Sequence, residues 1–408
     1  MALPTEVWER VILHVNDDSL EERRCRSLAA CARTCCSWLP RSRYYMFRNV
    51  NVTSPTNDNV CLTTLVKSLR AGPWNGMLVE SLSISGTGTQ RSDHISTALL
   101  LLSSLLKNVT LLRLGSVDMV HLHPDFFRYL AQFKSIRRLQ FSVPARPTIQ
   151  HYARLVQALP KLSSLFLTPS YIDLKHRPAR SKAIARRPMH PTLSALEIEL
   201  GTQGNDATEI HSPFFQWIVM STTITHTLTN FEYNCIHHAT EAEITMLNDF
   251  LAHCGALKRI AIHALGRCMG DVDVGALPIQ HINLEHNVNL NFLSFGFLTL
   301  STSPWYHTLV STITSTHLSS IRIIFEEDYM TRVDWQSPEL DKTIHSLIVS
   351  YPRLRIESEV HYEHSEFVLW NDLPRRWKNL LPSVWRLDAF SSTFKPFSGL
   401  ERHYRGFD

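Results

Sequence analysis

The sequence predicts an α/β fold in which a small N-terminal helical module precedes an irregular solenoid of parallel strands and helices. Three observations predict it. Apolar residues recur at helical spacing over the first 40 residues. From residue 79, an apolar residue, two variable residues and an apolar-x-apolar triplet recur about every 30 residues. Stretches with helical spacing separate these copies, so each repeat supplies one strand and one helix and must stack on its neighbours to bury its apolar face.

Composition narrows the functional classes. Hydrophobic residues make up 44% of the 408 residues, which is enough for a large core, and only 14 are glycine, which disfavours a glycine-rich nucleotide-binding chain. The formal net charge of +4 is too small to indicate nucleic-acid binding by the chain as a whole. Four of the eight cysteines lie at positions 25, 31, 35 and 36, at helical spacing. We expect them to be reduced and to pack as small apolar side chains.

The N-terminus does not resemble an export signal, because charged residues interrupt the segment where an apolar core is needed. The most apolar stretches, residues 98–106 and 292–300, are shorter than the roughly 20 residues that span a bilayer. We therefore expect no membrane association and a cytoplasmic or nuclear location, or both.

Two helices are predicted at the N-terminus. Pro4 is suited to open the first helix, whose apolar stripe comprises Val7, Trp8, Val11, Ile12 and Val15. Residues 19–22 match a capping box that would start the second helix. The apolar face of the second helix comprises Leu28, Cys31, Cys35, Trp38 and Leu39. Pro40 is expected to end it. Helices this short cannot bury both faces in a core of their own, so some apolar surface is expected to meet another protein.

The same residues resemble an F-box of the fungal type. The resemblance rests on Leu3-Pro4-x-Glu6, Ile12, Leu28-x-x-Cys31-x-x-x-Cys35-x-x-Trp38 and Arg43-x-x-x-Phe47-Arg48. It implies a helical module that docks on a Skp-type adaptor and thereby joins a cullin-based SCF ubiquitin ligase. The residues that it implies as adaptor-facing or as the core of the module are Leu3, Pro4, Val7, Ile12, Leu28, Cys31, Cys35 and Trp38. The alternative is that all of them only pack the N-terminal helices against the rest of the chain.

The repeated pattern predicts the strands of the solenoid. Its copies lie at residues 79–84, 109–114, 136–141, 162–167, 193–198, 228–233, 257–262, 279–284, 318–323 and 351–356. The helical stretches between them lie at residues 95–106, 124–133, 149–159, 213–220, 241–254 and 338–351. The gap between 279 and 318 is long enough for one further unit, with its strand at residues 293–297.

This arrangement resembles a leucine-rich-repeat horseshoe. That family carries an asparagine three residues beyond each strand, and only Asn287 occupies this position here, so regular curvature is not assured. The predicted boundaries are an F-box module at 1–50, an N-terminal cap or linker at 51–78, the solenoid at 79–360 and a C-terminal cap at 361–408.

No catalytic or cofactor-binding motif is found. The sequence lacks the phosphate-binding loop, the nucleophile elbow and the H-E-x-x-H zinc motif, and its 21 histidines lack the spacing of zinc ligands. We therefore expect no metal, no cofactor and no enzymatic activity.

One basic segment lies between two predicted strands. It spans residues 175–188 and carries six cations and no acid, namely Lys175, Arg177, Arg180, Lys182, Arg186 and Arg187. Three interpretations stay open: a solvated loop, an arm for an acidic or phosphorylated substrate, or a nuclear-import segment. Aromatic residues do not alternate with these cations, so nucleic-acid binding is not favoured.

The leading functional hypothesis is a substrate-recognition subunit of an SCF-type ubiquitin ligase that serves ubiquitin-dependent protein degradation. Its N-terminal helices would bind the adaptor, and its solenoid would bind a protein substrate. A leucine-rich-repeat interaction scaffold without a ligase is the first alternative. A hydrolase with no recognisable motif is the second, and it requires a nucleophile, a histidine and an acid that converge in a pocket.

Overall fold

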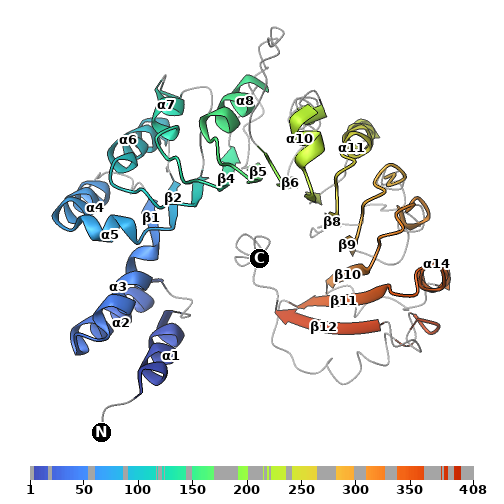
Figure 1. Cartoon of the computed structure of the whole chain (residues 1–408), viewed down its shortest axis with the longest axis horizontal. Coiled ribbons are helices and arrows are strands. Elements are labelled where there is room, and N and C mark those ends of the chain that lie inside the picture. The colour runs from blue at the N-terminus through green and yellow to red at the C-terminus, as the bar shows by residue number, and fades with distance from the viewer. Residues whose placement is uncertain are drawn as a thin grey trace, which may run out of the picture. The chain divides into compact units, whose positions relative to one another are not determined.

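The structure is a computed structural model of the chain (Figure 1). The chain divides into two compact units, Met1–Asp173 and Leu174–Asp408. The residues that the structure describes are 4–16, 21–53, 60–85, 91–115, 117, 122–123, 125–143, 149–169, 192–200, 215, 218–219, 222–235, 241–263, 282–297, 309–326, 338–362, 378, 381–384 and 390–396.

The first unit begins with three helices, α1 (Thr5–Asn16), α2 (Glu21–Thr34) and α3 (Leu39–Arg48). The prediction that Pro40 ends the second helix is wrong. Helix α2 ends at Thr34, and Pro40 lies in the first turn of α3, where a missing N–H breaks no hydrogen bond.

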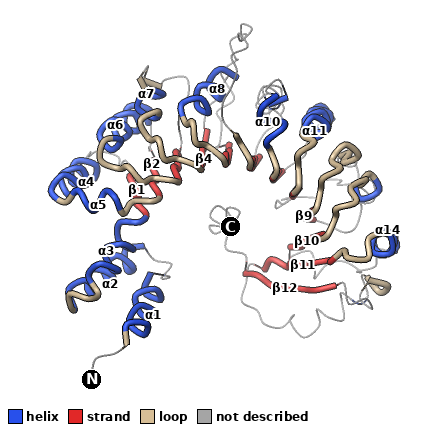
Figure 2. The backbone as a smooth tube through the Cα atoms, viewed as in Figure 1, coloured by secondary structure: helices blue, strands red, loops and turns tan. Residues whose placement is uncertain are grey.

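A parallel sheet follows in the first unit, and its described strands pair in sequence order. They are β1 (Asn49–Thr53), β2 (Ser81–Ser85), β3 (Leu111–Gly115), β4 (Arg138–Val143) and β5 (Ser164–Pro169). The helices between them are α4 (Val60–Ala71), α5 (Pro73–Met77), α6 (Arg91–Ser103), α7 (Phe126–Leu130) and α8 (Ile149–Ala158). These helices cover one face of the sheet (Figure 2).

The second unit has the same plan. Its strands are β6 (Ala195–Leu200), β7 (Asn230–Cys235), β8 (Arg259–His263), β9 (Phe292–Phe297), β10 (Ser320–Glu326), β11 (Arg355–Tyr362) and β12 (Phe390–Pro396). All these neighbours pair in parallel and in sequence order. Helices α10 (Thr222–Thr227), α11 (Glu241–His253) and α14 (Pro338–Ser350) lie on one face (Figure 1).

The core lies between strands and helices, as the period-two pattern requires. The two apolar residues of each apolar-x-apolar triplet are buried, as in Leu112 and Leu114 of β3 or Ile260 and Ile262 of β8. The intervening residue points to the other face of the sheet. Each buried Leu or Ile side chain contributes about 1.5–3 kcal/mol relative to an exposed one, so the repeated pattern stabilises every unit of the array.

The predicted parallel-strand α/β array is confirmed, with one strand misplaced. Residues 282–284, the described part of the predicted strand 279–284, form no strand, although Ile282 and Leu284 are buried. Strand β8 pairs directly with β9, which confirms the further strand expected near 293–297. Parallel pairing also extends beyond the expected limits of the solenoid, to β1 at residue 49 and to β12 at residue 396.

Successive repeats are joined at the turns before the strands. In most of these turns one carbonyl accepts two N–H groups of the next repeat, as Thr110 O does from Arg137 and Arg138 at 2.9 Å each. Hydroxyl groups add to this ladder, for example Ser135 Oγ, which donates to Val109 O at 2.7 Å. These contacts satisfy the carbonyls of the turns before the strands, at the opposite end of the strands from the position where the leucine-rich-repeat family carries its asparagine. Asn287 follows no strand, and its Nδ2 instead donates to Leu251 O at 3.0 Å.

Candidate functional site

Helices α1–α3 enclose a small core. Ile12, Leu28 and Tyr45 are buried there, one from each helix. Six side chains pack around them: Trp8, Val15, Cys31, Trp38, Tyr44 and Met46. The rings of Trp8 and Trp38 stack with their centroids 6.1 Å apart. The helices therefore form a packed module whose core uses one side of α1.

Another side of α1 is apolar and exposed. Val7 and Val11 lie one turn apart and are 43% and 44% exposed. We call these two residues the α1 valine pair. Leu13 is 44% exposed as well, but two residues along a helix is a rotation of about 200°, so it points elsewhere. The valine pair borders the core side of α1, where Trp8 and Ile12 lie, and extends the apolar surface of the module outward.

The structure sorts the residues singled out by the F-box resemblance into three groups. Pro4, Val7 and Cys35 are exposed, whereas Cys31 and Trp38 are partly buried. Ile12 and Leu28 have no exposed surface, so in this conformation they support the module from within. Leu3 lies outside the described residues. Val11 belongs to the predicted apolar stripe of the first helix but not to the residues of the F-box resemblance. The packing of the three helices determines that its side chain is exposed.

Cys35 lies in the turn between α2 and α3. Its Sγ is 3.0 Å from Ser37 Oγ, and its carbonyl accepts the N–H of Trp38 at 3.2 Å. The hydrogen bond with Ser37 lowers the pKa of the Cys35 thiol, which is exposed. Burial has the opposite effect on Cys254, where it raises the thiol pKa to about 12. Cys35 is thus the more readily ionised of these two thiols.

The module is joined to the sheet by Glu80, which precedes β2. Its carboxylate accepts from Tyr44 OH and from Arg48 Nε, both at 2.9 Å. Burial and the hydrogen bond to Glu80 raise the pKa of Tyr44. Helix α3 ends at Arg48 and β1 begins at the next residue, so no linker separates the module from the first strand.

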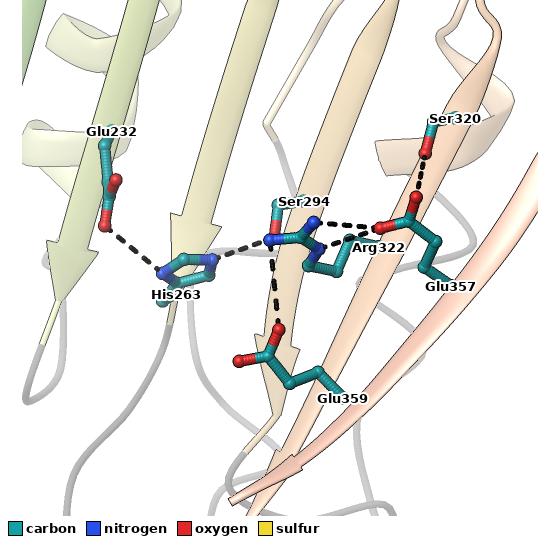
Figure 3. A network of polar contacts seen from close by, with 7 residues as sticks. All are labelled: Glu232, His263, Ser294, Ser320, Arg322, Glu357 and Glu359. Atoms are coloured by element: carbon teal, nitrogen blue, oxygen red, sulfur yellow. Dashed lines mark hydrogen bonds and ion pairs between the residues drawn. The ribbon is translucent and has the colours of Figure 1, made fainter. Parts of the chain in front are cut away.

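A polar network covers part of the second unit's sheet, on the face opposite the helices (Figure 3). The strand register explains how these residues meet. Glu232, Ser294, Arg322 and Glu357 occupy one row across β7 to β11, with Ala261 between the first two. His263 and Glu359 lie in the row two residues further along the strands. We call this set, together with Asn234 and Ser320, the sheet-face network.

His263 is the centre of one half of this network. Its Nδ1 is 2.9 Å from Asn234 Oδ1 and 3.7 Å from Glu232 Oε1, and its Nε2 is 3.0 Å from Ser294 Oγ. Asn234 Nδ2 donates to Glu232 Oε1 at 3.0 Å, which turns Oδ1 toward the ring. Since Oδ1 can only accept, the proton of the neutral ring lies on Nδ1, and Nε2 accepts from the Ser294 hydroxyl.

This order of groups matches that of a nucleophile, a base and an orienting residue. Ser294, however, is only 3% exposed and lies within an interior strand that pairs with both β8 and β10. The N–H groups of such a strand are committed to the ladder on either side, so β9 offers none to an oxyanion. In the described part of the chain, the arrangement therefore orients His263 and Ser294 without the donors that acyl transfer needs.

Arg322 is the centre of the other half. Its Nε and Nη2 donate to Glu357 Oε2 at 3.1 and 2.9 Å, and its Nη1 is 3.8 Å from Glu359 Oε2 (Figure 3). Ser320 Oγ donates to the other oxygen of Glu357 at 3.4 Å. Glu359 is only 5% exposed, so Arg322 compensates a largely desolvated carboxylate. This half of the network is held in one geometry by charge.

Other candidate features are less informative. The basic segment with Lys175, Arg177, Arg180, Lys182, Arg186 and Arg187 lies outside the described residues. Among the residues that the structure does describe, no three His, Cys, Asp or Glu side chains are grouped to hold a metal ion. Within the same residues, none of the helices has both the length and the apolar character needed to cross a bilayer.

Neither a scan against protein-family models nor a search of curated proteins finds a match to the chain.

Proposed function

We propose that the chain is the substrate-recognition subunit of an SCF-type ubiquitin ligase, with α1–α3 docked on a Skp-type adaptor and the strand array bound to a protein substrate. The observation that carries the proposal is the exposed α1 valine pair on a packed three-helix module. Apolar side chains that are well ordered and exposed on a helix are suited to the centre of a protein interface. The F-box resemblance, which includes Val7 but not Val11, implies a Skp-type adaptor as the partner.

The direct joint between α3 and β1 supports the proposal in a second way. A substrate receptor acts by holding its substrate at a defined distance from the catalytic subunits, which raises the local concentration of the reacting groups. A flexible linker would lower that concentration. In this chain, Arg48 and Tyr44 both bond to Glu80, so the helical module and the first strands are fastened to each other.

The sheet-face network supports the assignment of the second unit to substrate binding. Ordered charged and polar groups on an otherwise regular sheet give specificity, because a partner must match both their charge and their spacing. The network uses side chains of five neighbouring strands, β7 to β11. Under the proposal, the substrate contacts this face and the ubiquitin chemistry belongs to the cullin-bound partners.

Binding of the purified full chain to a purified Skp-type adaptor tests the first half of the proposal. Val11→Asp should weaken binding by about tenfold or more, because it places a charge in the apolar contact. Leu13→Asp is the matched control, since it introduces the same charge on the same helix at the same 44% exposure but on another side. Both variants should melt like the wild-type chain, because both positions are exposed.

Equal binding by the two variants, or no binding by the wild-type chain, would contradict adaptor docking through this face. In that case the interaction scaffold without a ligase becomes the better interpretation. The substrate half of the proposal is tested by comparing ubiquitylated proteins in cells with the wild-type chain and with Val11→Asp. Proteins whose ubiquitylation depends on Val11 are then the candidates for substrates.

A further inference from the structure

The turns that precede β2 to β5 form a groove along one edge of the first unit. The groove has a volume of about 420 Å³. In the order of the strands, its lining residues are Met77 and Glu80, then Asn108 and Thr110, then Ser135 and Arg137, and finally Lys161. We call it the edge groove. It belongs neither to the α1 valine pair nor to the sheet-face network.

The edge groove lies in a basic surrounding. Five cations lie on the turns that form it or at the start of the adjoining strands, and all are exposed: Lys107, Lys134, Arg137, Arg138 and Lys161. None of them pairs with a carboxylate of a described residue. The described stretches 104–115, 131–143 and 149–169 contain no Asp or Glu at all. Because neighbouring strands lie about 4.8 Å apart, the cations of successive turns form a closely spaced row.

The hydrogen bonds between successive turns determine which groups of the groove remain available as donors and which as acceptors. Ser135 and Thr110 use their hydroxyl protons on backbone carbonyls, at 2.7 and 3.3 Å, so their oxygens are left as acceptors. Asn108 Nδ2 donates one proton to Met77 O at 2.8 Å and has a second to offer. Arg137 and Lys161 supply only donors. The groove thus combines cationic donors with neutral acceptors a few ångströms apart.

Glu80 closes the groove at the turn before β2, and this decides between two classes of anionic ligand. Its carboxylate accepts from Arg48 and Tyr44 and is still 40% exposed. A nucleic-acid backbone that extended along the groove from Lys161 would bring its phosphates next to the negative charge of Glu80. A peptide does not have this difficulty, because its carboxylates can lie on Arg137 and Lys161 while its N–H groups reach the acceptor oxygens and Glu80.

We propose that the edge groove binds an acidic peptide segment, whose carboxylates pair with Arg137 and Lys161 and whose backbone N–H groups donate to Ser135, Thr110 and Glu80. The proposal does not depend on adaptor docking, because it concerns binding by the chain alone. Binding through exposed ion pairs weakens as salt screens them over about 8 Å at physiological ionic strength.

Fluorescence anisotropy of the purified full chain tests the proposal, with a labelled peptide of alternating glutamate and glycine as the probe. The double variant Arg137→Glu with Lys161→Glu should weaken binding by about tenfold or more. The double variant Lys67→Glu with Arg128→Glu makes the same charge change on helices of the same unit and should bind like the wild type. Both should melt at the wild-type temperature. Higher salt should weaken the wild-type complex and hardly change the groove variant.

Two results would overturn the proposal. One is that the peptide of alternating glutamate and glycine binds no better than its glutamine counterpart, or that both double variants weaken it equally, which would indicate a diffuse charge effect. The other is that a labelled single-stranded oligonucleotide binds more tightly than the acidic peptide and loses its binding in the groove variant. The edge groove would then be a nucleic-acid site.

Discussion

Arg48 and Glu80 are joined twice, although 32 residues separate them. Arg48 Nε donates to Glu80 Oε2 at 2.9 Å, and the backbone N–H of Glu80 donates to Arg48 O at the same distance. The backbone bond is the first rung of the turn ladder that joins all later repeats of the first unit. The array of hydrogen-bonded turns therefore begins at Arg48, the last residue of the helical module. The ion pair between the Arg48 and Glu80 side chains stabilises this junction.

Glu80→Ala should loosen the module without unfolding it. The side chains of Arg48 and Glu80 are 45% and 40% exposed, so the ion pair contributes about 0.5–1 kcal/mol at most. We expect faster hydrogen exchange in α3 and β1 and little change in the melting temperature. Glu80→Gln is the control, because it keeps an acceptor for Tyr44 and should show a smaller effect. Equal exchange in both variants and the wild type would contradict a fastening role.

Ile12→Ala and Val11→Ala should differ strongly in stability although the residues are adjacent. Ile12 is fully buried among Leu28 and Tyr45, and truncation of such a side chain costs about 2–5 kcal/mol. Val11 is 44% exposed, and its truncation should change stability by less than about 0.5 kcal/mol. Denaturant unfolding followed by tryptophan fluorescence measures both, since Trp8 and Trp38 stack beside Ile12. Similar losses of unfolding free energy in the two variants would contradict the burial of Ile12 and the exposure of Val11.

Cys35 should be alkylated at lower pH than an ordinary thiol. Its pKa is lowered by the hydrogen bond with Ser37, so the reactive thiolate is already populated at a pH where a free thiol is mostly protonated. The alkylation rate should rise with pH through this lowered pKa. Ser37→Ala should shift the rise to higher pH. Cys254, whose pKa is raised to about 12 by burial, should stay unmodified in the folded chain and is the internal control.

The same cysteine reports on adaptor docking. If α1–α3 bind an adaptor through the face that includes Cys35, the adaptor should slow its alkylation in the wild-type chain but not in Val11→Asp. Mass spectrometry of the peptide that contains Cys35 measures the rate. Protection of Cys35 in both chains would show that docking does not require Val11, and protection in neither would show that the adaptor does not cover Cys35.

Arg322→Met should destabilise the second unit. It removes the cation that faces the nearly buried Glu359 and the Glu357 carboxylate, at a cost of about 1–2 kcal/mol after allowance for the partial exposure of Arg322. Denaturant unfolding of the purified chain measures this loss.

A double-mutant cycle with Glu359→Gln separates this electrostatic effect from packing. The substitution Glu359→Gln keeps the volume of the side chain and removes its charge. Arg322→Met should cost less in that background if the ion pair is the cause. An unchanged cost would assign the effect to the contact of the Arg322 guanidinium with the Phe292 ring, whose centroid is 5.3 Å from Cζ.

The sequence predicts burial better than it predicts hydrogen bonding. The predicted strands other than 279–284 match observed strands, because each carries apolar residues at period two between a sheet and a helix. Ile282 and Leu284 show the same pattern and are buried, but they lie in a segment of turns ahead of β9. The pattern reports that a side chain faces the core and says nothing about which strand its backbone joins.

In the candidate site, too, the sequence predicts which residues are apolar but not which of them are exposed or which polar side chains meet. Val11 and Ile12 belong to one apolar stripe, and only the packing of α2 and α3 against α1 decides which of them is exposed. Ser294 and His263 are 31 residues apart, and they meet because the register of β8 and β9 places them diagonally on neighbouring strands. The motif does encode this register, because the middle residues of the apolar-x-apolar triplets pair with one another from β7 to β10. The sequence did not bring His263 and Ser294 together because the strand predicted at 279–284 would lie between theirs, whereas β8 pairs directly with β9.

The junction between Arg48 and Asn49 has a consequence for domain exchange. Because β1 follows α3 without a spacer, the helical module sets the phase of the first strand, in which Val52 is buried and its neighbours Asn51 and Thr53 are exposed. A single residue inserted at this point would invert inside and outside along the whole strand, whereas two residues would restore the order. We therefore expect that this helical module can be transferred to another strand array only when the number of residues inserted or deleted at the junction is even.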